Sequence, residues 1–165
     1  MAGAPVLAYV GLGANLGGTV AALRSALLAL SLLPGTQIQR TSSFYRTAPI
    51  DSHGPDYLNA VAVLQTTLAP DDLLTHLQHI EQAGGRERPY RNAPRTLDLD
   101  LLLYGEARLA SSTLTVPHPR LHERAFVLVP LAEIAPVGLA IPGRGALRDL
   151  LAGVADQAIH KLETP

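Results

Sequence analysis

The sequence of 165 residues contains no cysteine, and Lys161 is its only lysine. The absence of cysteine excludes disulfides, thiol nucleophiles and cysteine-ligated zinc. Aromatic residues make up only 4% of the chain, too few for a stacking platform on single-stranded nucleic acid. The net charge of −1 provides no basic field for a duplex, so we expect no nucleic-acid partner.

We expect neither a signal peptide nor a membrane span in this sequence. The start of the chain has no basic region, and the most apolar later stretch, residues 21–33, contains Arg24 and ends at Pro34-Gly35. With 47% hydrophobic and 16% charged residues, the composition is that of one compact globular domain. We therefore expect residues 1–165 to form a single domain of a cytoplasmic protein.

Charge is distributed unevenly along the chain. No Asp or Glu precedes Asp51, and all basic residues except Lys161 are arginines. A phosphate site in this chain would therefore depend on planar guanidinium groups, which make bidentate contacts, and not on a Walker-type lysine.

Hydrophobic periodicity and turn residues predict the order strand, helix, strand, strand, helix, strand. The strands are expected over residues 6–10, 37–45, 57–66 and around 97–101, and the helices over 19–33 and 70–85. This is the order of an α+β, ferredoxin-like fold with a mainly antiparallel sheet. As C-terminal additions we expect strand within 108–116, an apolar helix or strand over 124–134, and a short helix over 146–154.

Two aspartates interrupt a strand that otherwise consists of leucines. Side chains at i and i+2 of a strand share a face, so Asp98 and Asp100 point the same way, about 7 Å apart along the strand. Charges placed there must meet Arg, Lys or a metal ion, and hard divalent ions prefer oxygen ligands.

An ion pair with nearby arginines is the simple structural interpretation of these acids. However, Arg86, Arg88, Arg91 and Arg95 precede them with only Glu87 between, which is more positive charge than two aspartates require. The surplus favours a bound polyphosphate whose metal ions the carboxylates hold.

The glycines Gly11, Gly13 and Gly17 follow the first predicted strand. They are similar to a dinucleotide-binding fingerprint, but the third glycine is one residue late and no acid follows about 20 residues on. A tight turn between strand and helix accounts for them, and Asn15 can adopt a left-handed turn or present its amide to a ligand.

Tyr57 and Asn59 share a face of the third predicted strand. They are either a polar pair at the edge of the sheet or, if buried, a site for a flat heterocycle with an amide-like edge. His76 and His79, or His118 and His122, have spacings compatible with zinc, but no third ligand accompanies either pair. His118 is either a turn residue or a phosphate donor beside Arg124.

Five ordered segments resemble 6-hydroxymethyl-7,8-dihydropterin pyrophosphokinase, a folate-pathway family that moves the β,γ-diphosphate of ATP to a pterin hydroxymethyl group. They are Tyr9-Val-Gly-Leu-Gly-Ala-Asn-Leu-Gly17, Ser42-Ser-Phe-Tyr-Arg-Thr-Ala-Pro49, Pro55-Asp-Tyr-Leu-Asn-Ala60, Pro94-Arg-Thr-Leu-Asp-Leu-Asp-Leu101, and Leu114-Thr-Val-Pro-His118 with Arg124 and Phe126.

The resemblance implies a role for each matching residue. The catalytic residues would be Arg86, Arg95, Asp98 and Asp100, with the two aspartates binding two Mg²⁺ ions. ATP would contact Gln78, Glu81, Arg88, Arg95, Leu101, Thr115, His118 and Arg124. The pterin would contact Thr47, Ala48, Ile50, Tyr57, Asn59 and Phe126.

The chain departs from the family pattern at three places. Asn92 stands where the family often has tryptophan, Thr113 where some members have arginine, and Pro119 where others have an aromatic residue. The resemblance also implies a monomer. The alternative from another functional class is a non-catalytic ferredoxin-like module that binds a small ligand, because one fold serves many functions.

Overall fold

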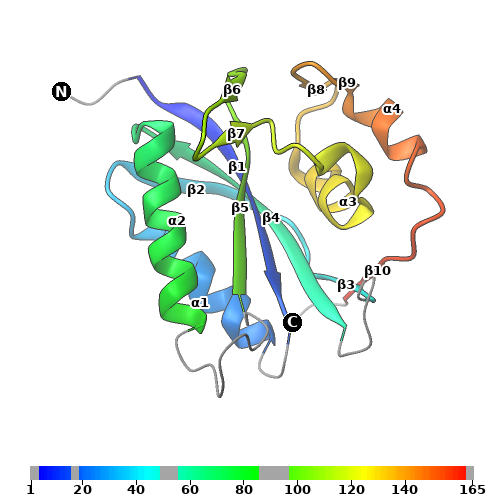
Figure 1. Cartoon of the computed structure of the whole chain (residues 1–165). Coiled ribbons are helices and arrows are strands. Elements are labelled where there is room, and N and C mark those ends of the chain that lie inside the picture. The colour runs from blue at the N-terminus through cyan, green and yellow to red at the C-terminus, as the bar shows by residue number, and fades with distance from the viewer. Residues whose placement is uncertain (1–3, 16–18, 49–55, 86–96, 163–165) are drawn as a thin grey trace.

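The centre of the molecule is a twisted antiparallel sheet (Figure 1). The structure is a computed structural model and describes residues 4–15, 19–48, 56–85 and 97–162. The strands of the sheet are β1 (Val6–Ala14), β2 (Thr36–Thr41), β3 (Tyr45–Thr47), β4 (Tyr57–Thr66), β5 (Leu97–Tyr104) and β10 (His160–Lys161). Their order is β10-β3-β4-β1-β5. Strand β2 also pairs with β4, nearer the C-terminal end of β4 than β3 does.

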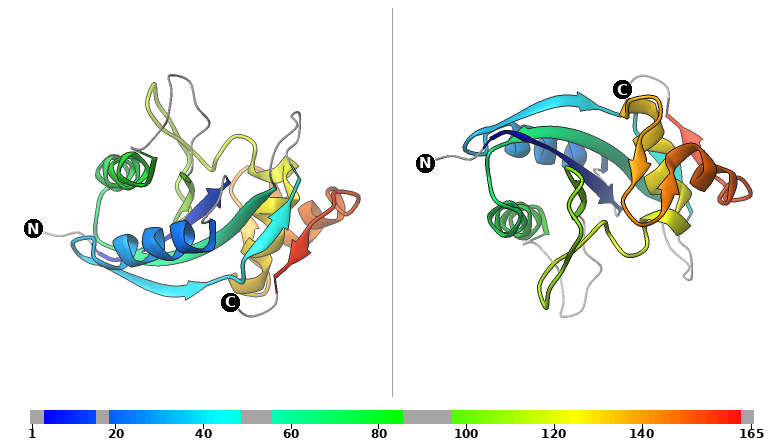
Figure 2. Two further views of the ribbon diagram at one scale, coloured as in Figure 1. Left: turned by 90° about the horizontal axis from the view of Figure 1, so that it is seen from below. Right: turned by 90° about the horizontal axis from the view of Figure 1, so that it is seen from above.

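Helices cover both faces of this sheet. On one face lie α1 (Thr19–Ser31) and α2 (Pro70–Gly85), whose leucines pack against alternate residues of β1, β4 and β5. On the other lie α3 (Ala125–Ile134) and α4 (Leu147–Ala152), preceded by the 3₁₀ helix η1 (Leu121–Glu123). Figure 2 shows α3 and α4 together and away from α1 and α2. None of the helices in the described ranges is long and apolar enough to cross a bilayer.

The two hydrophobic clusters follow from strand alternation. In β5, Leu97, Leu99 and Leu101 belong to the cluster under α1 and α2, while Leu102 and Leu103 belong to the cluster under α3. The register with β1 shifts at this point, so that β5 carries one extra residue. Such a bulge changes the face toward which the following side chains point. Here the side chains at the end of β5 point toward α3.

The predicted order of the six central elements is confirmed, but several boundaries differ. The strand predicted over 37–45 is two strands, because Ser42 breaks the ladder: its Oγ accepts the N–H of Val61 at 2.9 Å in place of a backbone carbonyl. The first helix ends at Ser31 because Pro34 disfavours helical geometry just before it. The first strand continues to Ala14, well beyond the predicted end.

The C-terminal additions are also resolved into elements. Residues 108–116 form the hairpin of β6 (Leu109–Ala110) and β7 (Thr115–Val116), and residues 124–134 form helix α3, although Pro130 lies inside it. A second short hairpin joins β8 (Ala140–Ile141) to β9 (Gly145–Ala146). The predicted final helix is α4, which is shorter than residues 146–154.

Helix α3 is tied to the start of β3 by one carboxylate. Glu133 accepts hydrogen bonds from the Ser43 N–H at 3.0 Å, the Ser43 hydroxyl at 2.8 Å and the Tyr45 hydroxyl at 2.6 Å. Partial burial acts to raise the pKa of Glu133, but these hydrogen bonds and the charge of Lys161 together lower it. Burial and the Glu133 carboxylate in turn raise the pKa of Tyr45.

We expect Glu133→Gln to lower the free energy of unfolding at neutral pH by only about 1 kcal/mol, because the carboxylate that loses its charge-assisted hydrogen bonds is partly exposed to solvent. A carboxyl whose pKa is lowered by folding stabilises the protein above its unfolded-state pKa, and this stabilisation is lost as the pH falls through the folded-state pKa. Urea unfolding should therefore show the two proteins converging in stability below about pH 4. Glu106→Gln, at an exposed turn, is the control, and a gap that does not change with pH would contradict this role.

Candidate active site

Two cavities adjoin the polar part of the sheet. The first, about 380 Å³, opens over the face of β1, β4 and β5 that α3 only partly covers. Its lining includes Gly11, Gly13, Thr47, Ala48, Tyr57, Asn59, Asp98, Asp100, Leu102, Arg124 and Phe126. A volume of this size with a few convergent polar groups is typical of small-molecule sites.

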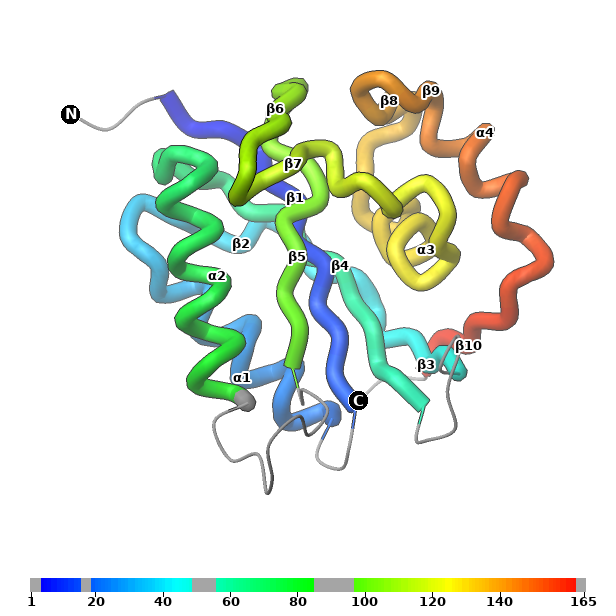
Figure 3. The backbone as a smooth tube through the Cα atoms, in the orientation of Figure 1, coloured from blue at the N-terminus to red at the C-terminus, as the bar shows by residue number. Residues whose placement is uncertain are grey.

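Glycines of β1 make room for the acid pair of β5. Asp98 lies opposite Gly13 and Asp100 opposite Gly11, and Figure 3 traces β1 between β4 and β5. Because glycine has no side chain, nothing on β1 covers the carboxylates from that side. The interpretation of Gly11 and Gly13 as a turn between strand and helix is therefore wrong, since both lie within β1.

Asn59 forms the opposite wall of the same cavity. It pairs with Gly13 on one side and with Tyr45 on the other, so it is in the interior of the sheet and not at the edge. It is 6% exposed, and its Nδ2 donates to Thr47 Oγ1 at 2.8 Å. An amide carries two N–H donors and one oxygen acceptor. Thr47 therefore leaves one donor and the oxygen for a ligand with an amide-like edge.

Two aromatic rings also line the first cavity. Tyr57 comes from the start of β4 and Phe126 from the first turn of α3. The Arg124 guanidinium carbon lies 5.3 Å from the centre of the Phe126 ring, within the range of a cation–π contact. This arrangement gives the cavity two apolar rings beside a fixed positive charge.

The second cavity, about 280 Å³, runs along the edge of β5 that has no partner strand in the described sheet. Leu99, Asp100, Leu101, Thr115 and His118 are among its lining residues. The His118 N–H donates to the Leu102 carbonyl at 3.0 Å and so fixes the segment after β7 against β5. Asp100 lines both cavities, which places a carboxylate where they meet.

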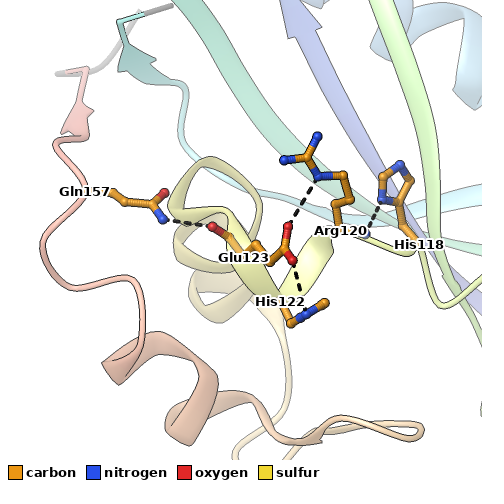
Figure 4. A network of polar contacts seen from close by, with 5 residues as sticks. All are labelled: His118, Arg120, His122, Glu123 and Gln157. Atoms are coloured by element: carbon orange, nitrogen blue, oxygen red, sulfur yellow. Dashed lines mark hydrogen bonds and ion pairs between the residues drawn. The ribbon is translucent and has the colours of Figure 1, made fainter. Parts of the chain in front are cut away.

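Burial and neighbouring charges shift the pKa values of the groups around Asp100. Burial lowers the pKa of His118, as do Arg124 and Arg120, while Asp100 acts to raise it. With its pKa lowered the imidazole is neutral at neutral pH, and its Nδ1 accepts the Arg120 N–H at 3.2 Å (Figure 4). The proton therefore lies on Nε2, where it can be donated to a ligand.

Arg124 is the other group suited to an anion. Burial and the neighbouring Arg120 lower its pKa, whereas Asp100 and Glu123 act to raise it. Its Nε is buried and has no hydrogen-bond partner among the described residues. A buried donor without a partner is costly, so this N–H is a candidate contact for a bound anion.

Most predicted site residues in the described ranges gather at the two cavities. Thr47, Ala48, Tyr57, Asn59, Phe126, Arg124 and the two aspartates line the first; Leu101, Thr115 and His118, again with Asp100, line the second. Gln78 and Glu81, on α2, are absent from both linings; Glu81 accepts the Leu99 N–H at 2.8 Å. The predictions for Ile50, Arg86, Arg88 and Arg95 fall outside the described residues.

Some site features were not predicted. Gly11, Gly13 and Leu102 line the first cavity, and the period-two spacing of the glycines opposite a period-two acid pair was the available signal. For the zinc alternative, the described part of the chain contains no group of three or more His, Asp or Glu that could hold a metal ion. His76 and His79 instead line a groove between α1 and α2.

Gly13→Ala tests the space that the glycines provide. A Cβ at Gly13 would lie 3.2 Å from Asn59 Oδ1, whereas one at Gly11 would make ordinary contact with Leu102 at 3.4 Å. Because Thr47 holds the buried Asn59, we expect Gly13→Ala to cost about 1–2 kcal/mol of stability, as overpacking does. Gly11→Ala should leave the free energy of unfolding nearly unchanged. Equal unfolding midpoints in urea for the two variants would show that Asn59 can move aside freely.

Comparison with known proteins shows a consistent family. A sequence model described as 7,8-dihydro-6-hydroxymethylpterin-pyrophosphokinase (HPPK) matches residues 9–136. The chain is 45% identical over 158 residues to the 2-amino-4-hydroxy-6-hydroxymethyldihydropteridine pyrophosphokinase of Haemophilus influenzae, covering 95% of this chain and 98% of that protein. It is 44% identical over 155 residues to the protein of the same name from Pseudomonas aeruginosa, covering 93% and 95%.

Solved structures confirm the fold. The HPPK-DHPS of Plasmodium falciparum, crystallised as the wild type with SDX-DHP, matches with a TM-score of 0.69 and 16% identity. The match covers 89% of this chain and 43% of that longer chain. The ferredoxin-like α+β architecture predicted from the order of the elements is thereby confirmed.

Proposed function

The chain belongs to the 7,8-dihydro-6-hydroxymethylpterin-pyrophosphokinase family, and we propose that it transfers the β,γ-diphosphate of ATP to the hydroxymethyl group of 6-hydroxymethyl-7,8-dihydropterin in folate biosynthesis, with release of AMP. The observation that carries this proposal is the position of Asp100, which lines two neighbouring cavities. A non-catalytic binding module is not favoured, because the close relatives are named as the enzyme.

The first cavity is the proposed pterin site. A flat bicyclic ring would lie against Tyr57 and Phe126, and its aminopyrimidinone edge would meet the Asn59 amide that Thr47 orients. Ala48 and Ile50 are proposed to contribute backbone contacts. In this pose the hydroxymethyl group points along the cavity toward the acid pair.

The second cavity is the proposed nucleotide site. Leu101 and Thr115 would surround the adenine, while His118 Nε2 and the Arg124 guanidinium would contact phosphate. Gln78 and Glu81 of α2 are proposed as further nucleotide contacts. Arg86, Arg88 and Arg95 complete the proposed phosphate site on the basis of the sequence alone.

The acid pair fits a divalent metal site. Asp98 and Asp100 are oxygen donors on one face of β5, they line a cavity, and Gly11 and Gly13 of β1 add no side chain beside them. Mg²⁺ is bound through one or two carboxylates together with phosphate oxygens and water, so two protein ligands suffice. We propose that Asp98 and Asp100 would hold two Mg²⁺ ions here, and that the ions would supply positive charge to offset that of the phosphate oxygens.

The residues of the chain then position the two reactants. The pterin oxygen attacks the β-phosphorus in line, the bond from that phosphorus to the α,β-bridging oxygen breaks, AMP leaves, and the hydroxyl proton passes to solvent. Arg124 and the neutral His118 donate to phosphate oxygens, and Arg86 and Arg95 are proposed to meet the charge that develops. Orientation and electrostatics account for most of the acceleration, and no covalent enzyme intermediate is needed.

We expect Asp98→Asn and Asp100→Asn to lower turnover by about a hundredfold or more, because each removes a negatively charged ligand from the proposed metal site. The assay mixes the protein with ATP, Mg²⁺ and 6-hydroxymethyl-7,8-dihydropterin and measures AMP. Asp149→Asn, on exposed α4, is the matched control and should keep wild-type activity. Near-wild-type turnover in either site variant would refute the metal assignment, and a wild-type chain that forms no AMP would refute the function.

Arg95→Ala tests the proposed transition-state role of a loop guanidinium. We expect the rate constant kcat to fall more than the affinity for ATP, because the contact strengthens as charge develops. Parallel titration with a non-hydrolysable ATP analogue and steady-state kinetics separate the two effects. Arg148→Ala removes an exposed arginine on α4 and serves as the control. A change in KM alone would count against the assignment.

We propose that residues 1–165 form one pyrophosphokinase domain, because both hydrophobic clusters pack against a single sheet. We further propose that the chain acts as a cytoplasmic monomer without a nucleic-acid partner. Its net charge of −1 supports the last of these points.

A further inference from the structure

Gln157 links the C-terminal segment to the start of α3. This residue follows α4 and lies beyond residue 136, where the match to the family's sequence model ends. Its side-chain amide makes two hydrogen bonds. Oε1 accepts the Ala125 N–H at 2.9 Å. Nε2 donates to the Glu123 carbonyl at 2.8 Å, and Figure 4 shows this second bond. The two bonded residues flank Arg124 on either side.

These hydrogen bonds pair backbone groups at the start of α3 that have no partner within the helix. The first N–H groups of an α-helix have no acceptor within the helix. Ala125 is the first residue of α3, and the preceding Arg124 makes no side-chain cap. The amide of Gln157 supplies the missing acceptor and at the same time binds the carbonyl before Arg124. It therefore holds both peptide groups next to this residue.

The turn that Gln157 holds carries two residues of the first cavity. Arg124 and Phe126 both line it, and the guanidinium lies over the aromatic ring. Because the two side chains come from adjacent positions on either side of Ala125, a shift of this turn would move the charge and the ring together. The position of the turn thus sets the shape of the cavity wall that Arg124 and Phe126 form.

The segment around Gln157 is anchored independently of this side chain. The Gln157 N–H donates to the Val154 carbonyl at 3.0 Å, and Val154 is buried in the cluster under α3. Replacing the side chain of Gln157 should therefore leave its backbone in place. The two amide hydrogen bonds can be removed without detaching the C-terminal segment.

We propose that Gln157 is a positioning residue for pterin binding, which acts by holding the turn that carries Arg124 and Phe126. The inference rests on the function proposed above, because it concerns the same cavity. It adds to that function a contribution from a residue outside the part of the chain that the family's sequence model matches. Gln157 does not line the cavity itself and acts only through the turn.

Three variants separate positioning from general stabilisation. Gln157→Met keeps the length of the side chain but removes both hydrogen bonds, and Gln157→Glu keeps the acceptor for Ala125 but loses the donor to the Glu123 carbonyl. Gln39→Met is the control. It removes a hydrogen bond of 2.8 Å between the side-chain amides of Gln39 and Gln65 at an exposed position on β2. The dissociation constant for 6-hydroxymethylpterin is measured by calorimetry, beside the unfolding midpoint of each protein.

We expect Gln157→Met to raise the dissociation constant about fivefold to tenfold, the size of effect that follows from losing one or two hydrogen bonds. Gln157→Glu should raise the dissociation constant less. Gln39→Met should leave the dissociation constant unchanged even if it lowers the stability by a comparable amount. An unchanged dissociation constant in Gln157→Met would overturn the inference. If AMP formation by the wild type is normal in that case, the proposed function stands and only the role of Gln157 fails.

A second readout needs no variant. In the wild type the Ala125 amide should exchange with solvent as slowly as amides inside α3, although it is the first residue of the helix. Fast exchange at Ala125 would show that the bond to Gln157 is not maintained and would overturn the proposal even if Gln157→Met does not fold. Protection of this amide that increases when 6-hydroxymethylpterin binds would support it.

Discussion

The pairing of two glycines with two aspartates across adjacent strands is the constraint on which the site depends. Asp98 faces Gly13 and Asp100 faces Gly11, and Gly13 in turn pairs with Asn59 of β4. A carboxylate, a bare backbone and a buried amide therefore stand in one row across three strands, with neighbouring strands about 4.8 Å apart. The floor of the first cavity is this row. A larger residue at either glycine would place a side chain beside the acids.

The rest of the fold supports that row from both faces. Under it, the leucines of α1 and α2 pack on the alternate residues of β1, β4 and β5, which keeps the three strands in register. Above it, α3 covers only the end of the sheet beyond the bulge in β5 and leaves the polar end open. Glu133 and Gln157 hold the two ends of α3 to other elements, and Arg124 and Phe126 extend from its start into the cavity.

The sequence predicted what depends on local pattern. Alternation in β5 placed Asp98 and Asp100 on one face, and periodicity located α2 and the strand over residues 57–66. Prediction from the sequence failed where pairing between distant segments determines the structure. Local pattern predicts a turn at the glycines because their partners on β5 lie 85 to 89 residues away, and Ser42 breaks a strand only because Val61 is its neighbour. The bonds of Glu133 and Gln157 likewise join residues that no local pattern relates.

We propose that the acid pair lies between the pterin and the nucleotide and holds metal ions there. A crystal structure with Mg²⁺, a non-hydrolysable ATP analogue and 6-hydroxymethylpterin tests it most directly. We expect the pterin in the cavity of about 380 Å³, the adenine in that of about 280 Å³, and metal density between the phosphates and both aspartates. Aspartates paired with arginines, with no ion between them and the phosphates, would contradict it.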